Sequence, residues 1–156
     1  MGRRAEFAID LIDPAAAEGS LEIAEKLALK RRVGRADAFI VVTPEYNHSY
    51  PAVLKALIDS IYVEWQTKPV AFVSYGGVAA GLRAVEHLRL VFAELHAVGI
   101  RDVVAFPNAW QQFDANGALH SPERAEKAMT TLLDRLAWWA IALRGAREAS
   151  AYPEAA

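Results

Sequence analysis

The sequence predicts a single α/β domain in which helices cover both faces of a parallel sheet. Short and nearly continuous apolar runs alternate with longer amphipathic stretches, and the joins between them are short. Apolar runs without a polar face are typical of strands buried on both sides, and their alternation with helices predicts right-handed crossovers. A length of 156 residues suits one domain, which we expect to span residues 1–156.

The same patterns predict the individual elements. Strands are expected at residues 7–12, 38–42, 70–73 and 103–106. Helices are expected at residues 20–35, 51–61, 80–98 and 121–140, with Ser20 and Ser121 as N-terminal signals and Gly99 as the end of the third helix. Residues 108–120 form the one long irregular connection, which we interpret as a flap or a partner-contact loop.

The composition excludes several classes of function. The net charge of −2 gives no electrostatic reason to expect binding to nucleic acid or to an anionic membrane. The absence of cysteine removes disulfides, thiolate nucleophiles and cysteine-ligated metals. No apolar stretch reaches the roughly 20 residues of a membrane helix. Because Glu6 and Asp10 interrupt the N-terminal segment, it does not resemble a signal peptide, and we expect a cytoplasmic protein.

Two predicted strands are followed by segments of unusual composition, which begin at Thr43 and at Ser74. The first runs to residue 51 and holds aromatic and hydrogen-bonding side chains between two prolines, and the second runs to residue 81 and is rich in glycine. Ligands of open parallel sheets bind at the carboxyl ends of the strands, and glycine lets backbone amides approach them closely. Together the two segments predict a flat slot edged with backbone N–H and C=O groups, and a planar heteroaromatic ring suits this slot. The residues alone also permit ordinary turns, with Tyr46 covering the core edge and Asn47 capping the next helix.

Other arrangements of reactive residues give weaker signals. The four histidines, which lack the close spacing of metal ligands, are His48, His87, His96 and His120. We therefore expect no metal site. Ser74 lacks the Gly-x-Ser-x-Gly pattern of a hydrolase, and the chain has no dinucleotide fingerprint or Walker loop. His48, inside the first loop, is a hypothetical contact for an electron acceptor, whereas His87 and His96 are expected at a helix surface or an interface.

The segment Thr43-Pro44-Glu45-Tyr46-Asn47, followed by Pro51, Leu54-Lys55 and Asp59, resembles the signature of the NADPH-dependent FMN reductases. That family has flavin, quinone, chromate and azo-dye reductases among its relatives. Its second loop has the form Ser-Tyr-Gly-Gly, as residues 74–77 do here, and the helix start Gly81-Leu82-Arg83-Ala84 also matches. The similarity extends from about Glu6 to Trp110. It implies a flavodoxin-like, three-layer α/β/α fold.

The resemblance also implies a cofactor site and a reaction. The FMN ring would lie against the two loops, and the cofactor-binding residues carried over from the family are Pro44, Glu45, Tyr46, Asn47, Ser74, Tyr75, Gly76 and Gly77. The implied reaction passes a hydride from NADPH or NADH to FMN and then electrons to a small acceptor such as a flavin or a quinone. Because the cofactor carries this chemistry, no catalytic acid–base pair is expected among the side chains.

The chain departs from the family pattern at its N-terminus. The family opens with a strand and a Gly-Ser-x-Arg-type loop that holds the FMN phosphate, and nothing of this kind precedes Phe7. Residues 4–13 match the family's second strand, so we expect a truncated domain that lacks the first strand and helix. Losing two or three charge-assisted hydrogen bonds would cost about 4–6 kcal/mol of binding free energy. The alternative is therefore a catalytically silent flavodoxin-like subunit that does not bind FMN tightly.

The resemblance also implies that the protein is an oligomer. Its members are commonly dimers or tetramers, so we expect a homodimer or a homotetramer with the FMN site near the subunit boundary. Trp138 and Trp139 are adjacent on the last predicted helix, where one ring is expected in the core and the other against a partner subunit.

Overall fold

Within the described residues the sheet has three strands in the order β1-β2-β3, and they are parallel, as the sequence predicts. The computed structural model describes residues 7–14 and 23–153, and its strands are β1 (Phe39–Pro44), β2 (Pro69–Tyr75) and β3 (Val98–Phe106). Phe39 pairs with Val70 and Pro69 pairs with Val98. β2 lies in the centre and is buried along its whole length except at Tyr75, which explains its continuous apolar sequence.

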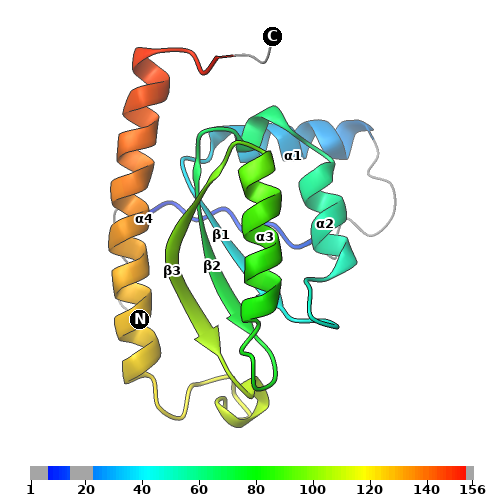
Figure 1. Cartoon of the computed structure of the whole chain (residues 1–156), viewed down its shortest axis with the longest axis vertical. Helices are drawn as coiled ribbons and strands as arrows, with labels where there is room; N and C mark the ends of the chain where they lie inside the picture. The colour runs from blue at the N-terminus through cyan, green and yellow to red at the C-terminus, as the bar shows by residue number, and fades with distance from the viewer. Residues whose placement is uncertain (1–6, 15–22, 154–156) are drawn as a thin grey trace.

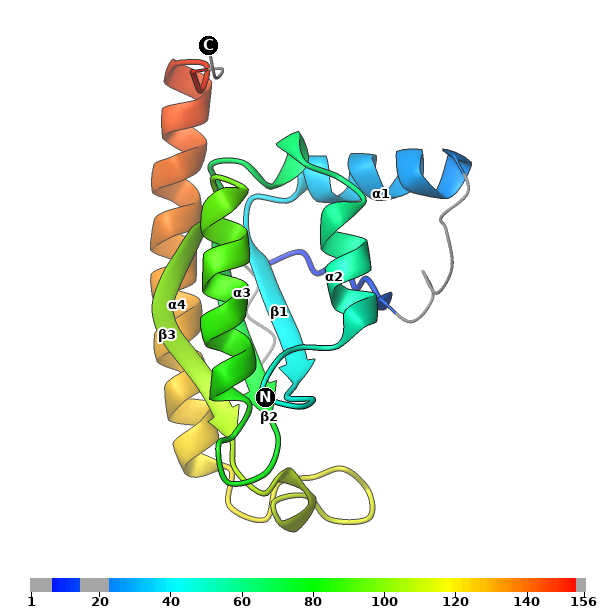
Figure 2. The ribbon, with the colours of Figure 1, turned by 45° about the vertical axis from the view of Figure 1, so that its right-hand side comes forward.

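In the described part of the chain, four helices cover the two faces of the sheet (Figures 1 and 2). They are α1 (Ile23–Arg35), α2 (Ala52–Asp59), α3 (Leu82–Glu94) and α4 (Glu123–Ala149). The first three lie over one face, and their buried residues share a core cluster with Phe72 of β2. α4 lies over the other face, where Leu132 and Leu136 pack with a second cluster. The architecture is therefore the predicted α/β/α arrangement.

The larger core is organised by aromatic rings. Phe92 of α3 is fully buried and makes an edge-to-face contact with Trp65, with ring centroids 5.6 Å apart. The ring of Phe72 in β2 also packs near Phe92, with ring centroids 6.1 Å apart. Trp65 lies in the short 3₁₀ turn η2 (Val63–Trp65), and its indole N–H donates to the Ile58 carbonyl of α2. These contacts fix α3, whose first turn borders the candidate site, against the sheet.

The prediction of a strand at residues 7–12 is wrong. The structure shows extended chain without strand pairing there, and Ile9 and Leu11 are 90% and 84% exposed. A strand needs a neighbour for its backbone hydrogen bonds, and within the described residues β1 pairs with β2 alone. The chain at residues 10–11 is held instead by Arg32 of α1, which donates to the Asp10 carboxylate and to the Leu11 carbonyl.

The end of α3 also differs from the prediction. The helix ends at Glu94, and Gly99 lies inside β3 instead of terminating the helix. His96 takes the left-handed backbone conformation at φ 57°, and the Ala97 amide donates to the Phe92 carbonyl at 2.9 Å. A non-glycine residue therefore makes the turn, which starts β3 at residue 98 instead of 103. α4 extends to Ala149, beyond the predicted residue 140, and Ser20 lies outside the described residues.

One face of β1 carries apolar side chains that the described elements leave open. Ile40 and Val42 are 41% and 61% exposed. They pair in register with Ala71 and Val73, which belong to the core cluster beneath α4. Because residues that pair directly point to the same face of a sheet, α4 covers this face over β2 and β3 and leaves β1 partly bare.

Lys68 is a buried cation that joins the sheet to α1. Its ammonium group donates to the carbonyls of Val33 and Gly34 at the end of α1, both at 2.8 Å. Burial, with Arg147 as a further cause, lowers the pKa of Lys68 to about 8 from its ordinary value of 10.5. Between these two values the unfolded chain holds a proton that the folded chain has lost.

The free energy of unfolding is therefore expected to rise with pH between about 8 and 10.5 through this group, and to gain nothing from it below pH 8. Urea unfolding of the wild type and of Lys68→Met at pH 7.5, 9 and 10 measures the effect. The wild type should gain stability relative to the variant as the pH rises. Parallel pH profiles for the two proteins would contradict the assignment.

Candidate functional site

The two unusual segments of the sequence lie side by side at the carboxyl ends of β1 and β2. We call residues 44–51 loop 1 and residues 75–81 loop 2. Pro44 pairs in register with Tyr75, and the Glu45 amide donates to the Tyr75 carbonyl at 3.1 Å. The parallel arrangement of neighbouring strands therefore brings both loops to the same edge of the sheet.

No helix of the described ranges is long and apolar enough to cross a membrane, and these residues contain no cluster suited to a metal ion.

Loop 1 is a tight turn that projects its central residues outward. Tyr46 and Ser49 exchange two backbone hydrogen bonds of 2.8 and 2.9 Å. Asn47 and His48 between them have φ values of 48° and 67°, as a type I′ turn requires. Within the described part of the chain, the backbone N–H groups of these two residues donate to no other group. The tip of loop 1 thus offers two free hydrogen-bond donors.

Loop 1 is a turn, but two details of the ordinary-turn interpretation are wrong. Asn47 does not cap the next helix, because α2 has Pro51 at its N-cap position and no side-chain hydrogen bond there. Tyr46 does not cover the core edge either, since its side chain is 61% exposed. An exposed aromatic ring beside unpaired amides is a surface suited to a planar polar ligand.

Loop 2 is held by its own backbone and by the chain after β3. The Gly76 amide donates to the Phe106 carbonyl at 3.3 Å, and the Gly77 carbonyl accepts from the Ala80 amide at 3.0 Å. Gly81 has a φ of 80°, and a Cβ there would lie 2.7 Å from the Cβ of Ser74. The loop can close this tightly only with glycine at position 81.

Ser74 does not face the proposed slot in this arrangement. It is fully buried, and its hydroxyl donates to the Ala80 carbonyl at 2.8 Å. Its side chain therefore holds loop 2 closed. Gly77, in contrast, is exposed, and its N–H makes no hydrogen bond within the described ranges. Tyr75 is 40% exposed at the end of β2.

A pair of contacts fastens loop 1 to α3. The Glu45 carboxylate accepts from the Arg83 guanidinium at 2.7 Å and from the Arg83 amide, at the start of α3, at 3.2 Å. One turn further along the helix, His87 Nδ1 lies 3.0 Å from the Ser49 hydroxyl. A carboxylate at a helix N-terminus is favoured by the helix dipole. Glu45 therefore positions loop 1, and its carboxylate is engaged within the protein.

Arg83 and His87 were not predicted as members of the site. His87 was expected at a helix surface or an interface. The i, i+4 spacing of these two residues, which places them on one face of a helix, was the available signal. Their partners in loop 1 are 38 positions away in the sequence, so only the folded arrangement identifies them.

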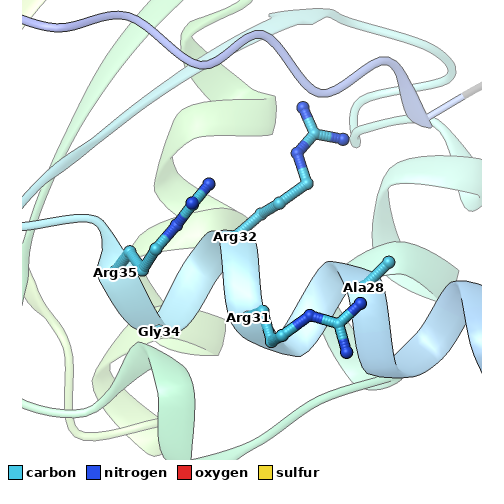
Figure 3. A pocket seen from close by; sticks show the side chains of 5 residues that line it. All are labelled: Ala28, Arg31, Arg32, Gly34 and Arg35. Carbon is cyan, nitrogen blue, oxygen red and sulfur yellow. The ribbon is translucent and has the colours of Figure 1, made fainter.

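Figure 3 shows a surface hollow on α1. It is lined by Ala28, Arg31, Arg32, Gly34 and Arg35 of α1. The end of α1 leads into β1 from the amino side, so the hollow lies at the opposite end of the strand from loop 1. Ion pairs from Arg32 and Arg35 reach Asp10, and the hydrogen bond from Arg32 lowers the pKa of that carboxyl. The hollow is a structural junction outside the candidate site.

Comparison with known proteins agrees with the geometry. Residues 6–111, more than half of the chain, match the sequence profile of the NADPH-dependent FMN reductases. The chain belongs to this family. The matched range contains both loops and ends just after Trp110, in agreement with the resemblance seen in the motifs. The family assignment and the flavodoxin-like fold class are thus confirmed.

Several named proteins share extended similarity with this FMN reductase family member. An NAD(P)H:quinone oxidoreductase of Solanum tuberosum is 36% identical over 114 residues, which cover 68% of this chain and 58% of the relative. A 2-hydroxy-1,4-benzoquinone reductase of a Burkholderia species is 34% identical over 120 residues, covering 72% and 64%. The flavoenzyme FerB, an NAD(P)H:acceptor oxidoreductase of Paracoccus denitrificans, superimposes with a TM-score of 0.60 at 25% identity, covering 83% of this chain and 73% of FerB.

The chain spans less than two thirds of the length of the curated relatives that it matches. The match to the family profile, at residues 6–111, contains both loops. Family membership therefore rests on the segments that form the candidate site.

Proposed function

We propose that this chain binds FMN against loops 1 and 2 and serves an NAD(P)H oxidoreductase that reduces flavins, quinones or similar acceptors. The observation that carries the proposal is that the backbone N–H groups of Asn47, His48 and Gly77 donate to no group within the described residues. Tyr46 directly precedes Asn47, Tyr75 lies two residues before Gly77, and both rings are exposed. Relatives named as FMN and quinone reductases support the same activity.

The residues of the two loops fit the flavin ring. Its pyrimidine edge carries carbonyl and ring-nitrogen acceptors, which need hydrogen-bond donors, and its flat faces pack well on aromatic side chains. Gly77 lacks the side chain that would separate its amide from a ligand. When bound, FMN accepts a hydride from NADPH or NADH and passes electrons to the acceptor. The protein's part is to orient the ring and to exclude water from one of its faces.

The silent flavodoxin-like subunit is the second candidate, and a specific observation favours it. α3 is the helix whose N-terminus borders both loops, and Glu45 already binds the amide of Arg83 there. A negative side chain at that end opposes a phosphate. Of the described helix N-termini, the one that borders both loops therefore offers no phosphate site for FMN.

A variant of Gly77 tests the site. A Cβ at Gly77 would lie 3.9 Å from Trp110 Cη2, an ordinary contact, so Gly77→Val should fold normally. The added side chain should cover the free amide and weaken FMN binding by about tenfold or more, equivalent to about 1.4 kcal/mol. Far-UV circular dichroism and an FMN titration measure the two effects.

Gly34→Val is the matched control, because a Cβ at Gly34 would also make only an ordinary contact, 3.8 Å to Glu64 Cγ, and Gly34 lies at the end of α1, away from both loops. Gly76 is a poorer test position, since a Cβ there would approach the Gly81 amide nitrogen to 3.3 Å. Equal FMN affinity of the wild type and Gly77→Val would overturn the placement of the ring at loop 2.

The assembly and the location belong to the same proposal. We propose a homo-oligomer, either a dimer or a tetramer, in the cytoplasm, where NADPH and NADH are supplied. Trp138 and Ile141 of α4 are 63% and 64% exposed, and such large apolar residues on one helix surface support an interface. Sedimentation equilibrium of the wild type and of Trp138→Glu tests the assembly, and an identical monomeric mass for both would contradict it.

A further inference from the structure

The chain after β3 places an exposed tryptophan next to loop 2. Trp110 lies in the 3₁₀ turn η3 (Ala109–Gln111) and its side chain is 69% exposed. The proposed binding of FMN to the two loops assigns no role to it. A large indole that packs into neither core cluster contributes little to folding, so its placement calls for another explanation.

The backbone that carries Trp110 is hydrogen-bonded to loop 2. The Asn108 amide donates to the Gly77 carbonyl at 3.0 Å, and the Ala109 amide donates to the Gly76 carbonyl at 3.1 Å. Asn108 itself takes the left-handed conformation at φ 46°, which turns the chain from β3 toward the loop. Residues 108–110 therefore keep a fixed position relative to the glycines of the site.

The remainder of the segment is also ordered. The ring of Phe113 packs on Phe106 with centroids 5.5 Å apart, and Phe113 forms a backbone bridge with Leu119. The Asp114 carboxylate accepts from the amides of Asn116 and Ala118, both at 2.8 Å. The indole of Trp110 is thus held by a structured loop, which lowers the entropy lost when a ligand packs against it.

The edge of the Trp110 ring lies beside the free amide of Gly77. A Cβ built at Gly77 would be 3.9 Å from Trp110 Cη2, so the indole adjoins the space over the glycine. The surface that it adds is flat and uncharged, as a neutral aromatic or quinonoid ring requires.

We propose that Trp110 is a specificity-determining residue that provides a packing face for planar electron acceptors of the quinone class. The inference rests on the proposed reductase function. In the overall reaction NADPH or NADH gives up one hydride, the solvent supplies one proton, and the quinone takes up two electrons and two protons to become the hydroquinone. Trp110 contacts the acceptor and takes no part in the transfer of electrons or protons.

The test compares Trp110→Ala, Trp110→Phe and the control Tyr62→Ala with the wild type. Tyr62 is also an exposed aromatic residue, at 48%, but lies just before η2, at the end of α2 opposite to loop 1. Steady-state rates are measured with menadione, a planar quinone, and with ferricyanide, an octahedral ion that cannot stack. Trp110→Ala should raise KM for menadione about tenfold, the value expected for the loss of one aromatic contact, and leave the ferricyanide parameters and the FMN affinity unchanged. Trp110→Phe should recover most of the loss.

A binding measurement separates this inference from the proposed function. Equilibrium dialysis of menadione against the full chain, with and without FMN, requires no turnover. If the wild type binds no FMN, the reductase proposal fails, while weaker menadione binding by Trp110→Ala still supports the role of Trp110. Equal menadione binding by the wild type and Trp110→Ala would overturn it. Dissociation of an oligomer by Trp110→Ala would also overturn it and would assign the indole to a subunit interface.

Discussion

Replacing Gly81 with alanine is expected to lower the free energy of unfolding by about 3 kcal/mol or more. The residue has a φ of 80°, and the new Cβ would lie 2.7 Å from Ser74 Cβ, 2.8 Å from the Tyr75 nitrogen and 2.9 Å from the Tyr75 oxygen. Two of these atoms are backbone at the end of β2, which cannot move without breaking its pairing with both neighbours. The substitution should therefore disturb loop 2 as well as the stability of the domain.

Gly117→Ala separates backbone strain from the clash. Gly117 has nearly the same φ, 79°, but a Cβ there would meet nothing within 4 Å. Gly117→Ala should therefore lower the free energy of unfolding only through the cost of the left-handed conformation, about 1–2 kcal/mol. Urea unfolding of Gly81→Ala and Gly117→Ala, analysed with the same m value, compares their losses in free energy of unfolding. Equal losses would show that loop 2 is loosely packed around Gly81.

Glu45→Ala is expected to cost about 1.5–3 kcal/mol of stability, because it removes charge-assisted hydrogen bonds to the guanidinium and to the amide of Arg83. The Glu45 side chain is only 9% exposed, so water does not replace these contacts easily. Loop 1 should then lose its attachment to the start of α3, and FMN affinity should fall with it. Chemical unfolding and an FMN titration report the two effects separately.

The control for this substitution is Asp59→Ala. Asp59 pairs with Lys55 on the surface of α2, where both side chains are about half exposed, and such i, i+4 pairs contribute only about 0.3–0.5 kcal/mol. Glu45→Gln, which keeps an acceptor for the Arg83 amide, should lie between the two. A loss for Glu45→Ala no greater than that for Asp59→Ala would mean that loop 1 does not depend on its contact with α3.

The sheet and its helices could be predicted because their signals are local. The apolar run ending at Val73 can hardly be other than a central strand, and the amphipathic stretches on both sides fit crossover helices. The segment at residues 7–12 has the same composition as a strand, yet it forms none because pairing depends on a neighbour elsewhere in the chain. The prediction that Gly99 ends the third helix is wrong for a similar reason. His96 takes the left-handed conformation at the turn, and Gly99 lies inside β3.

The candidate site was likewise predictable only in part. Its two loops could be located from composition and from the topology of parallel strands, which place the residues after β1 and β2 at one edge. The direction in which each side chain points could not be predicted from the sequence. Ser74 points into the protein toward the Ala80 carbonyl, and Glu45 is drawn to Arg83, because packing around loop 2 and the start of α3 decides both orientations.

The most direct test of the account is a titration of the full chain with FMN and, in parallel, with riboflavin, which has the same ring and no phosphate. Binding against loops 1 and 2 predicts saturable, one-to-one quenching of flavin fluorescence, with similar affinities for the two flavins and a weaker affinity for both in Gly77→Val. The absence of saturable quenching by either flavin would contradict the account, and the chain would then keep the family's scaffold without its cofactor.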